Sequence, residues 1–380
     1  MEFTFSPEQE ALREAVRSTL AAEAPMAFVR RMIDDERGFT DDLWQKLAGL
    51  GWLGLDVITY ARIVEELSAG WMSLSGVLNT HMMVATLLRL HGTPEQKSRW
   101  LPGILSADEH WCQGFSEPQA GSDLANLRCL ATRDGDEYVV EGTKIWISTA
   151  HIADWGLFLV RTDPTAIERK AKHEGITALI VDMHGRGIEC RPIRDITGDE
   201  MFNEVVFDGA RVPVAYHLGE EGQGWQVAMG TLGHERIGTA GMSITLASEL
   251  DRMIATVREH NPAALDDPDL RDRLARAWTQ ITLTRLLNYR ALSKVLKGEK
   301  NWPEVPLAKL QWSHLSQTLA ELGCDLLGPA GILSKGGPDA VDQGHWTYQY
   351  CWQRYTSIGA GTTEVQKNII ADRAIALPRR

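Results

Sequence analysis

The chain has 380 residues, of which 44% are hydrophobic and 24% charged, and its formal net charge is −12. This length suffices for two or three packed regions that share a large buried core. The acidic excess argues against a nucleic-acid partner, because phosphate binding relies on clustered Lys and Arg. No apolar run approaches the roughly 18 residues of a membrane span. The first residues resemble neither a signal nor a transit peptide, which predicts a cytoplasmic location.

Cysteines and histidines are scattered along the chain without metal-binding spacing. The cysteines form no C-x-x-C pair, and the histidines form no H-E-x-x-H motif. We therefore expect no metal site and five reduced, buried thiols, at Cys112, Cys129, Cys190, Cys324 and Cys351.

The first part of the chain has a helical pattern. Ser6 can cap a helix with Pro7 in its first turn, and apolar residues then recur at helical spacing. Further amphipathic stretches run over 41–50, 57–67 and 73–90. The pattern predicts an N-terminal α-helical domain over residues 1–109.

From about residue 110 the pattern changes to short runs rich in β-branched and aromatic residues, separated by turn residues. No long helices alternate with these runs, which favours an antiparallel β-barrel or sandwich over 110–213. The predicted strands include 138–140, 145–147, 156–160, 177–181, 187–193 and 203–207.

The remainder, residues 214–380, returns to a helical pattern. Breaks at Asn261-Pro262, at 301–303 and at 328–337 divide it into about four long helices. This order of helical, β and helical segments predicts an α+β multi-domain protein that ends in a four-helix bundle.

Two motifs in the β region suggest a ligand site. In Phe115-Ser116-Glu117-Pro118-Gln119-Ala120-Gly121-Ser122-Asp123, the glycine would let a ligand approach the backbone and the serines could donate hydrogen bonds. An ordinary β-turn has the same composition. In 140–148, the period of two puts Trp146 and Ser148 on one side of a strand, where they could face a flat ring, although a core Trp is commoner.

Together and in this order, the motifs resemble those of the acyl-CoA dehydrogenase family, and the resemblance covers nearly the whole chain. It extends to the segments 92–97, 203–213, 218–225 and 361–366. The family's three domains enclose FAD and an acyl thioester. The resemblance therefore implies an enzyme that removes the α and β hydrogens of an acyl-CoA to give the trans-2-enoyl-CoA.

The resemblance also implies site residues. Those implied to bind FAD are Gln113, Phe115, Ser116, Gly121, Ser122, Trp146, Ser148, Thr362 and Glu364. Those implied to bind the substrate are Ser122, Arg236 and Ala360.

The resemblance places the catalytic base on a helix of the C-terminal domain. Many relatives carry it near the C-terminus, in a segment that reads Tyr-Glu-Gly-Thr, but Ala360 stands there in this chain. Other branches, among them isovaleryl-CoA dehydrogenases, carry it on the first C-terminal helix, where this chain has Glu235. A carboxylate at either place need only reach the α-carbon. An exposed Glu235-Arg236 pair is the alternative.

Three segments depart from the family pattern. A loop that relatives have near the substrate mouth is shortened to Gly54-Leu55-Asp56. Two segments that supply FAD contacts from a neighbouring subunit are also changed, with Asn261-Pro262 in place of Phe-Gly and Asp325 in place of Gln. An Asp would repel a pyrophosphate.

These changes bear on assembly. The resemblance implies either a homotetramer or a heterotetramer with a homologous chain, on fatty or steroid side-chain acyl groups, with electrons passed to an electron-transfer flavoprotein. A non-catalytic or half-site subunit is the main alternative, and an oxidase or monooxygenase on the same fold is another. The sequence leaves the acyl chain length open.

Overall fold

The computed structural model describes residues 7–32, 40–50, 72–234, 239–297, 299 and 303–377. Contacts divide the chain into two compact units. The unit that we call the β unit takes in the described residues from 18 to 234. The other, the C-terminal unit, takes in 7–17 and the described residues from 239 onward. Helix α1 (Pro7–Glu23) crosses the division.

The helices of the β unit begin at residues that suit helix starts. Thr93 caps α6 (Pro94–Ser106) in a reciprocal capping box with Gln96. Thr40 caps α3 (Asp41–Gly49), accepting from the Leu43 amide. The others are α2 (Met26–Met32), α5 (Met72–His91), α7 (Thr165–Glu168) and α8 (Gly224–His234). The helix predicted over 57–67 lies outside the described residues.

One eight-stranded sheet forms the middle of the β unit, with strand order β6-β7-β3-β2-β4-β5-β8 and β1 paired to β4. Most pairs are antiparallel, while β1 runs parallel to β4 and β2 touches β4 at one parallel pair. The strands are β1 (Trp111–Gly114), β2 (Leu130–Asp134), β3 (Glu137–Ser148), β4 (Trp155–Arg161), β5 (Ile176–Asp182), β6 (Ile188–Ile193), β7 (Phe202–Pro213) and β8 (His217–Leu218).

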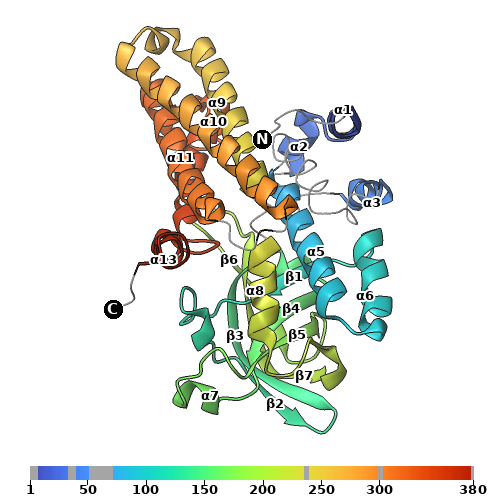
Figure 1. The fold of residues 1–380 in the computed structure, drawn as a ribbon. Helices are drawn as coiled ribbons and strands as arrows, with labels where there is room; N and C mark the ends of the chain where they lie inside the picture. The colour runs from blue at the N-terminus through green and yellow to red at the C-terminus, as the bar shows by residue number, and fades with distance from the viewer. Residues whose placement is uncertain are drawn as a thin grey trace. The chain divides into compact units, whose positions relative to one another are not determined.

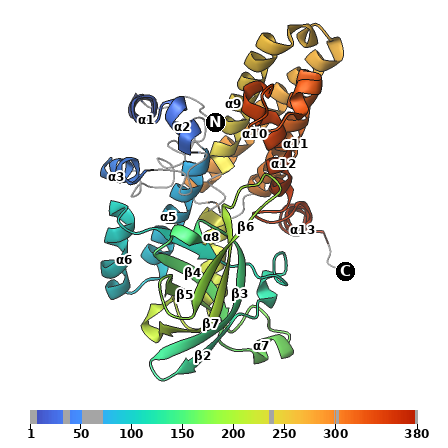
Figure 2. The ribbon, with the colours of Figure 1, turned by 180° about the vertical axis from the view of Figure 1, so that it is seen from behind.

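The two faces of the sheet pack into different cores because alternate residues of a strand point to opposite sides. Leu157 and Leu159 of β4 face a core shared with α5, α6 and α8, and these helices lie over that face in Figure 1. Phe158 and Val160 face the second core, with β3 and β7, whose strands lie in front in the reverse view (Figure 2).

The C-terminal unit is helical. Three long helices, α9 (Thr239–His260), α10 (Pro268–Leu296) and α11 (Glu304–Leu327), pack around Met253, Ile281 and Trp312. Two shorter ones follow, α12 (His345–Trp352) and α13 (Thr363–Arg373). The helices end near the predicted breaks, since α9 stops before Asn261 and α11 stops at Gly328.

None of the described helices is both long enough and apolar enough to cross a membrane.

Candidate active site

The two sequence motifs meet in the β unit. The first begins at Phe115, directly after β1, and the second lies in β3. The Ile145 amide donates a hydrogen bond of 3.0 Å to the Ser116 carbonyl oxygen. The loop after β1 and the last part of β3, about thirty residues apart in sequence, are therefore adjacent.

Trp146 presents its ring to the surface from an irregular point in β3. The pairing with β7 shifts register between Lys144 and Ile147, and Trp146 has a φ of 63°, a conformation that bulky residues rarely adopt. Its indole is 57% exposed and meets the Phe202 ring edge-on at 6.1 Å. A β-bulge commonly redirects a side chain in this way.

Ser148 lies beyond Trp146 on the exposed side of β3, whereas Ile147 between them is buried. Both Trp146 and Ser148 are therefore accessible from solvent at the end of β3. An exposed indole with a hydroxyl beside it fits the edge of a flat heteroaromatic ring such as a flavin.

Gly121 and Ser122 follow a tight turn in which the backbones of Glu117 and Ala120 exchange hydrogen bonds of 3.1 and 3.0 Å. Both residues are exposed. A Cβ built on Gly121 would meet no described atom within 4 Å, and its φ is not positive. Neither conformation nor packing requires glycine here, so the open space above it fits the close approach of a ligand.

Gln113 and Phe115 occupy alternate positions along β1 and its continuation. Phe115 is buried in the core that faces the helices. The Gln113 Oε1 atom is buried and accepts no hydrogen bond from any described residue. A buried acceptor without a donor costs about 1–3 kcal/mol, which a bound ligand with a donor group would remove.

Helix α8 ends directly before Glu235, the base that the resemblance implies, and packs in the same core as Phe115 of the first motif. Val227 and Ala228 of α8 belong to the same buried cluster as Phe115. At the start of α8, a Cβ on Gly224 would lie 2.5 Å from the Ala178 amide nitrogen, so only glycine permits this contact with β5. Glu235 and Arg236 follow α8 and lie outside the described residues.

The remaining predicted residues belong to the C-terminal unit. Thr362 caps α13 by accepting a hydrogen bond of 3.2 Å from the Val365 amide, and Glu364 lies exposed in the first turn. Ala360 is exposed with a φ of 53°. The buried Lys309 ammonium donates to the Gly361 carbonyl oxygen at 2.8 Å, which anchors this segment to α11.

The segments that depart from the family pattern use their polar groups internally. Asp325 forms an ion pair of 2.7 Å with Arg273, and the Asn261 amide donates to the Leu326 carbonyl oxygen at 2.7 Å. Both interactions lie within the C-terminal unit. The side chains that replace the family's FAD contacts are thus engaged in bonds of the chain itself.

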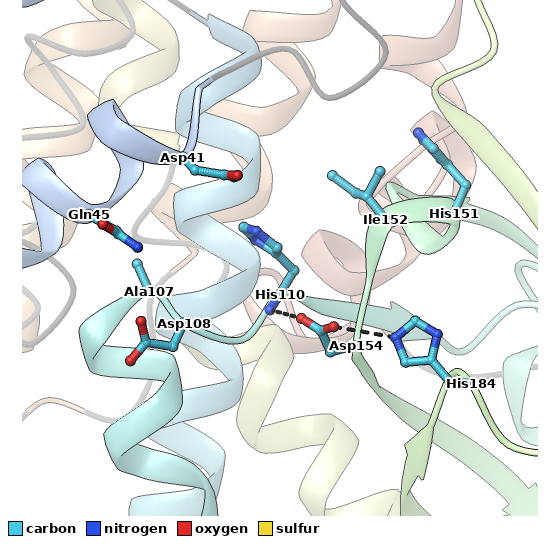
Figure 3. Close-up of a pocket in the computed structure, with 9 residues that line it drawn as sticks. All are labelled: Asp41, Gln45, Ala107, Asp108, His110, His151, Ile152, Asp154 and His184. Atoms are coloured by element: carbon cyan, nitrogen blue, oxygen red, sulfur yellow. Dashed lines mark hydrogen bonds and ion pairs between the residues drawn. The ribbon is translucent and has the colours of Figure 1, made fainter.

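Sequence reasoning missed a polar pocket in the β unit (Figure 3). Its volume is about 580 Å³. Asp154 lies between two histidines, accepting from the His110 amide at 2.8 Å and lying 3.3 Å from the His184 ring. The residues that line the pocket come from distant parts of the sequence and meet only in the folded chain. They are Asp41, Gln45, Ala107, Asp108, His110, His151, Ile152, Asp154 and His184.

The described residues were predicted to hold no metal site and only reduced thiols, and the positions of their His, Cys, Asp and Glu side chains bear on both points. Within them, no group of three or more His, Cys, Asp or Glu side chains is placed to hold a metal ion. All five cysteines are free, but the expectation that all are buried is wrong for three of them, since Cys190, Cys324 and Cys351 are partly exposed and only Cys112 and Cys129 are buried. Burial raises the pKa of the Cys129 thiol to about 12, so this thiol stays protonated and weakly nucleophilic near neutral pH.

Three sequence models of the acyl-CoA dehydrogenase family match the chain in order. The N-terminal domain model covers residues 6–108, the middle domain model 112–210 and the C-terminal domain model 222–375. The chain therefore belongs to the acyl-CoA dehydrogenase family. This family is FAD-dependent, and its three-domain architecture confirms the predicted fold class.

Individual proteins and solved structures resemble the chain over most of its length. The chain is 39% identical over 292 residues to the acyl-CoA dehydrogenase IpdE1 of Mycobacterium tuberculosis, covering 76% of this chain and 72% of that protein. It resembles the solved structure "Tcur3481-Tcur3483 steroid ACAD" with a TM-score of 0.88 and 29% identity, over 100% of both chains. The ChsE4-ChsE5 complex from Mycobacterium tuberculosis matches with a TM-score of 0.84 and 28% identity, also over 100% of both.

Proposed function

We propose that the chain catalyses the FAD-dependent α,β-dehydrogenation of an acyl-CoA thioester to the trans-2-enoyl-CoA. The observation that carries this proposal is the hydrogen bond between the Ile145 amide and the Ser116 carbonyl. It brings the loop and the strand that the family uses for FAD into one place. Family membership alone would support the same chemistry less specifically.

FAD would be held non-covalently, mostly by residues of the β unit. Ser116 and Ser148 would donate hydrogen bonds, Trp146 would flank the ring system, and the open backbone at Gly121 would accept the close approach of the cofactor. Gln113, Phe115, Thr362 and Glu364 complete the proposed set. When bound, FAD would accept the hydride that leaves the β-carbon.

Glu235 would be the base that takes the α-proton. It follows directly from α8, whose Val227 and Ala228 pack in one core with Phe115, and Ala360 leaves no carboxylate at the family's other position. A carboxylate in an apolar pocket binds its proton more tightly, which strengthens it as a base near neutral pH. Ser122, Arg236 and Ala360 would contact the acyl-CoA.

The substrate would be a bulky or steroid side-chain acyl-CoA, and the native assembly a heterotetramer with a homologous chain. The printed names of similar structures include a steroid ACAD and a two-protein complex. Asp325, ion-paired with Arg273, supports the assembly proposal, because a carboxylate in place of the family's Gln would repel the pyrophosphate of a partner's FAD. We further propose a cytoplasmic enzyme, divided at 1–109, 110–213 and 214–380, that passes electrons to an electron-transfer flavoprotein.

A half-site or non-catalytic subunit is the second candidate, and the same ion pair favours it. The absorbance spectrum of the purified protein separates the two. We expect a flavin spectrum that bleaches when acyl-CoA is added. A folded sample without flavin absorbance, even after mixing with FAD and a homologous partner, would contradict the dehydrogenase.

Flavin stoichiometry and native mass test the assembly. We expect fewer than one tightly held FAD per chain, or a homologous chain in the complex isolated from the native source. A homotetramer with full flavin occupancy would rule out the heteromeric proposal while leaving the dehydrogenase reaction in place.

A further inference from the structure

A buried ion pair joins the two motifs. The Lys144 ammonium of β3 lies 2.8 Å from the Glu117 Oε1 atom of the loop after β1. Their side chains are 0% and 2% exposed. Lys and Glu are almost never buried to this extent unless their charges are paired and their hydrogen bonds are made.

The Glu117 carboxylate is saturated with donors. Besides the Lys144 ammonium, Oε1 accepts from the Cys129 amide at 2.9 Å, and Oε2 accepts from the Arg128 amide at 2.7 Å and from the Gln119 side chain at 2.5 Å. Hydrogen bonds to an ionised acceptor are stronger and shorter than those between neutral groups. The carboxylate therefore fixes the loop against the segment that leads into β2.

Lys144 fixes the same loop against β3. Its ammonium donates to the Phe115 carbonyl oxygen at 3.0 Å, and the next amide in the strand, that of Ile145, donates to the Ser116 carbonyl oxygen. Two consecutive carbonyls of the first motif are thus held by two consecutive residues of the second. Trp146 follows immediately on this strand.

Stability alone does not explain the pair. A buried ion pair contributes little more than an apolar pair of the same size, because removing two charges from water offsets their attraction. The pair does set the spacing between the Phe115-Ser116 backbone and the exposed ring of Trp146. Small displacements of positioned groups reduce binding and catalysis strongly.

We propose that Glu117 and Lys144 are positioning residues that hold the Phe115-Ser116 loop and the Trp146-Ser148 strand at the separation FAD requires. Neither side chain touches the cofactor in this proposal, which rests on the proposed FAD-dependent function. The pair acts through the carbonyl of Phe115 and through the backbone of β3.

The first test measures FAD affinity of the full-length apoprotein by flavin fluorescence. Lys144→Met removes the ammonium and keeps most of the side-chain volume. We expect the dissociation constant for FAD to rise about tenfold or more, because small displacements of the groups that contact the cofactor weaken its binding. The visible circular dichroism of the bound flavin should change as well, since the ring would lie in altered surroundings.

A second variant keeps the test decisive if Lys144→Met folds poorly. In Glu117→Gln/Lys144→Met the carboxylate and the ammonium are removed together, so the melting temperature should recover part of the loss seen in Lys144→Met. The recovery is partial, because the Gln amide nitrogen cannot accept the backbone amide hydrogen bonds that both carboxylate oxygens accept, and because the buried Arg161 loses a nearby carboxylate. FAD affinity should stay about tenfold weaker, because the Phe115 carbonyl still lacks its donor. Recovery of stability without recovery of affinity is the result that a merely structural role would not produce.

Thr177→Val is the matched control. Thr177 is fully buried in the same sheet, where its hydroxyl bonds to Thr162 at 2.8 Å and accepts from the Gly222 amide at 2.9 Å. The variant should lower the melting temperature and leave FAD affinity within about twofold of the parent, because no bond to either motif is lost.

Two outcomes would overturn the positioning role. One is a Lys144→Met or double variant that binds FAD as tightly as the parent, and the other is a loss of affinity that Thr177→Val reproduces. Failure of the parent itself to bind FAD would instead contradict the proposed function.

Discussion

The two regions that the resemblance assigns to FAD binding differ in how their polar groups are used. In the β unit, buried charges hold the loop and the strand together, while Trp146 and Ser148 are left exposed. In the C-terminal unit, Asp325 pairs with Arg273 and Asn261 bonds to Leu326. In the first region buried bonds support a surface that fits a ligand, whereas in the second the replaced side chains themselves bond to other residues of the chain.

This difference supports the proposal that the chain retains only part of the family's FAD site. A region that still binds a cofactor keeps ring, hydroxyl and open backbone at the surface and places its supporting bonds beneath them. A region that no longer binds it can use the same positions for its own stability. The proposed heteromeric assembly rests on this contrast, and four substitutions test it.

The largest effect is expected at Glu235. Glu235→Gln keeps the shape of the side chain but removes the basic oxygen, so acyl-CoA should still bind while the rate of flavin bleaching at saturating substrate falls about 10²–10⁴-fold. Stopped-flow absorbance measures this rate. Ala360→Glu in the same background should restore part of the turnover, since it returns a carboxylate to the family's other position.

Glu259→Gln is the control for this change. It makes the same substitution at a carboxylate of α9 whose side chain is 76% exposed, and it should leave the rate unchanged. Bleaching of Glu235→Gln at the parent's rate would show that another group takes the α-proton, and Glu364 or Asp123 would be tested next.

Gly121→Val tests whether the open space at the loop belongs to a ligand. No described atom lies within 4 Å of the added Cβ, so the apoprotein should melt at nearly the parent temperature. FAD affinity should fall about tenfold, as expected when one or two methyl groups are forced into a packed contact. Isothermal titration of the apoprotein measures both enthalpy and affinity.

The matched control is Gly49→Val, because Gly49 in α3 also has no described atom within 4 Å of an added Cβ. It should not change FAD affinity. If Gly121→Val bound FAD as tightly as the parent, the open space at Gly121 would hold solvent rather than the cofactor, and the first motif would be an ordinary surface turn.

Much of the fold could be predicted from local sequence. The largely apolar runs at 156–160 and 177–181 became the centres of β4 and β5, and the break at Asn261-Pro262 ended α9. These features depend on side-chain pattern and on the restricted backbone of proline. The parallel pairing of β1 with β4 could not be predicted, because β1 has four residues and its partner is chosen by tertiary packing.

The candidate site was less accessible to sequence reasoning. The motifs indicated Ser116 and Trp146 as site residues. They could not predict the left-handed backbone of Trp146, because it depends on the register of β3 against β7. The ion pair of Asp325 joins it to Arg273, which lies 52 residues away in sequence. Such long-range pairs leave no periodic pattern in the chain, so Asp325 could be recognised only as a departure from the family.

Trp146 permits a test of stored strain in the β unit. Both Trp146→Ala and Trp146→Gly remove the ring and should weaken FAD binding alike. At a φ of 63° glycine is unstrained, whereas alanine is not, so the glycine variant should be about 1 kcal/mol more stable. Chemical denaturation of the two apoproteins measures the difference, and an alanine variant of equal or greater stability would show that the bulge relaxes without strain.

The smallest effect is expected at Asp325. Asp325→Gln restores the family's residue and breaks the pair with Arg273, whose side chain is 42% exposed against 54% for Asp325. An exposed pair of this kind is worth less than about 1 kcal/mol, so the free energy of unfolding should change by no more than that.

Flavin stoichiometry of the purified chain should also stay the same, because Asn261 still bonds to Leu326 and the neighbouring segment remains altered. Absorbance ratios of flavin to protein measure the stoichiometry, with Arg273→Gln as the control that breaks the same pair and keeps the Asp. A rise to one FAD per chain in Asp325→Gln alone would show that a single carboxylate, rather than a remodelled region, had closed the second half of the site, and a homotetramer would then become the better description of the assembly.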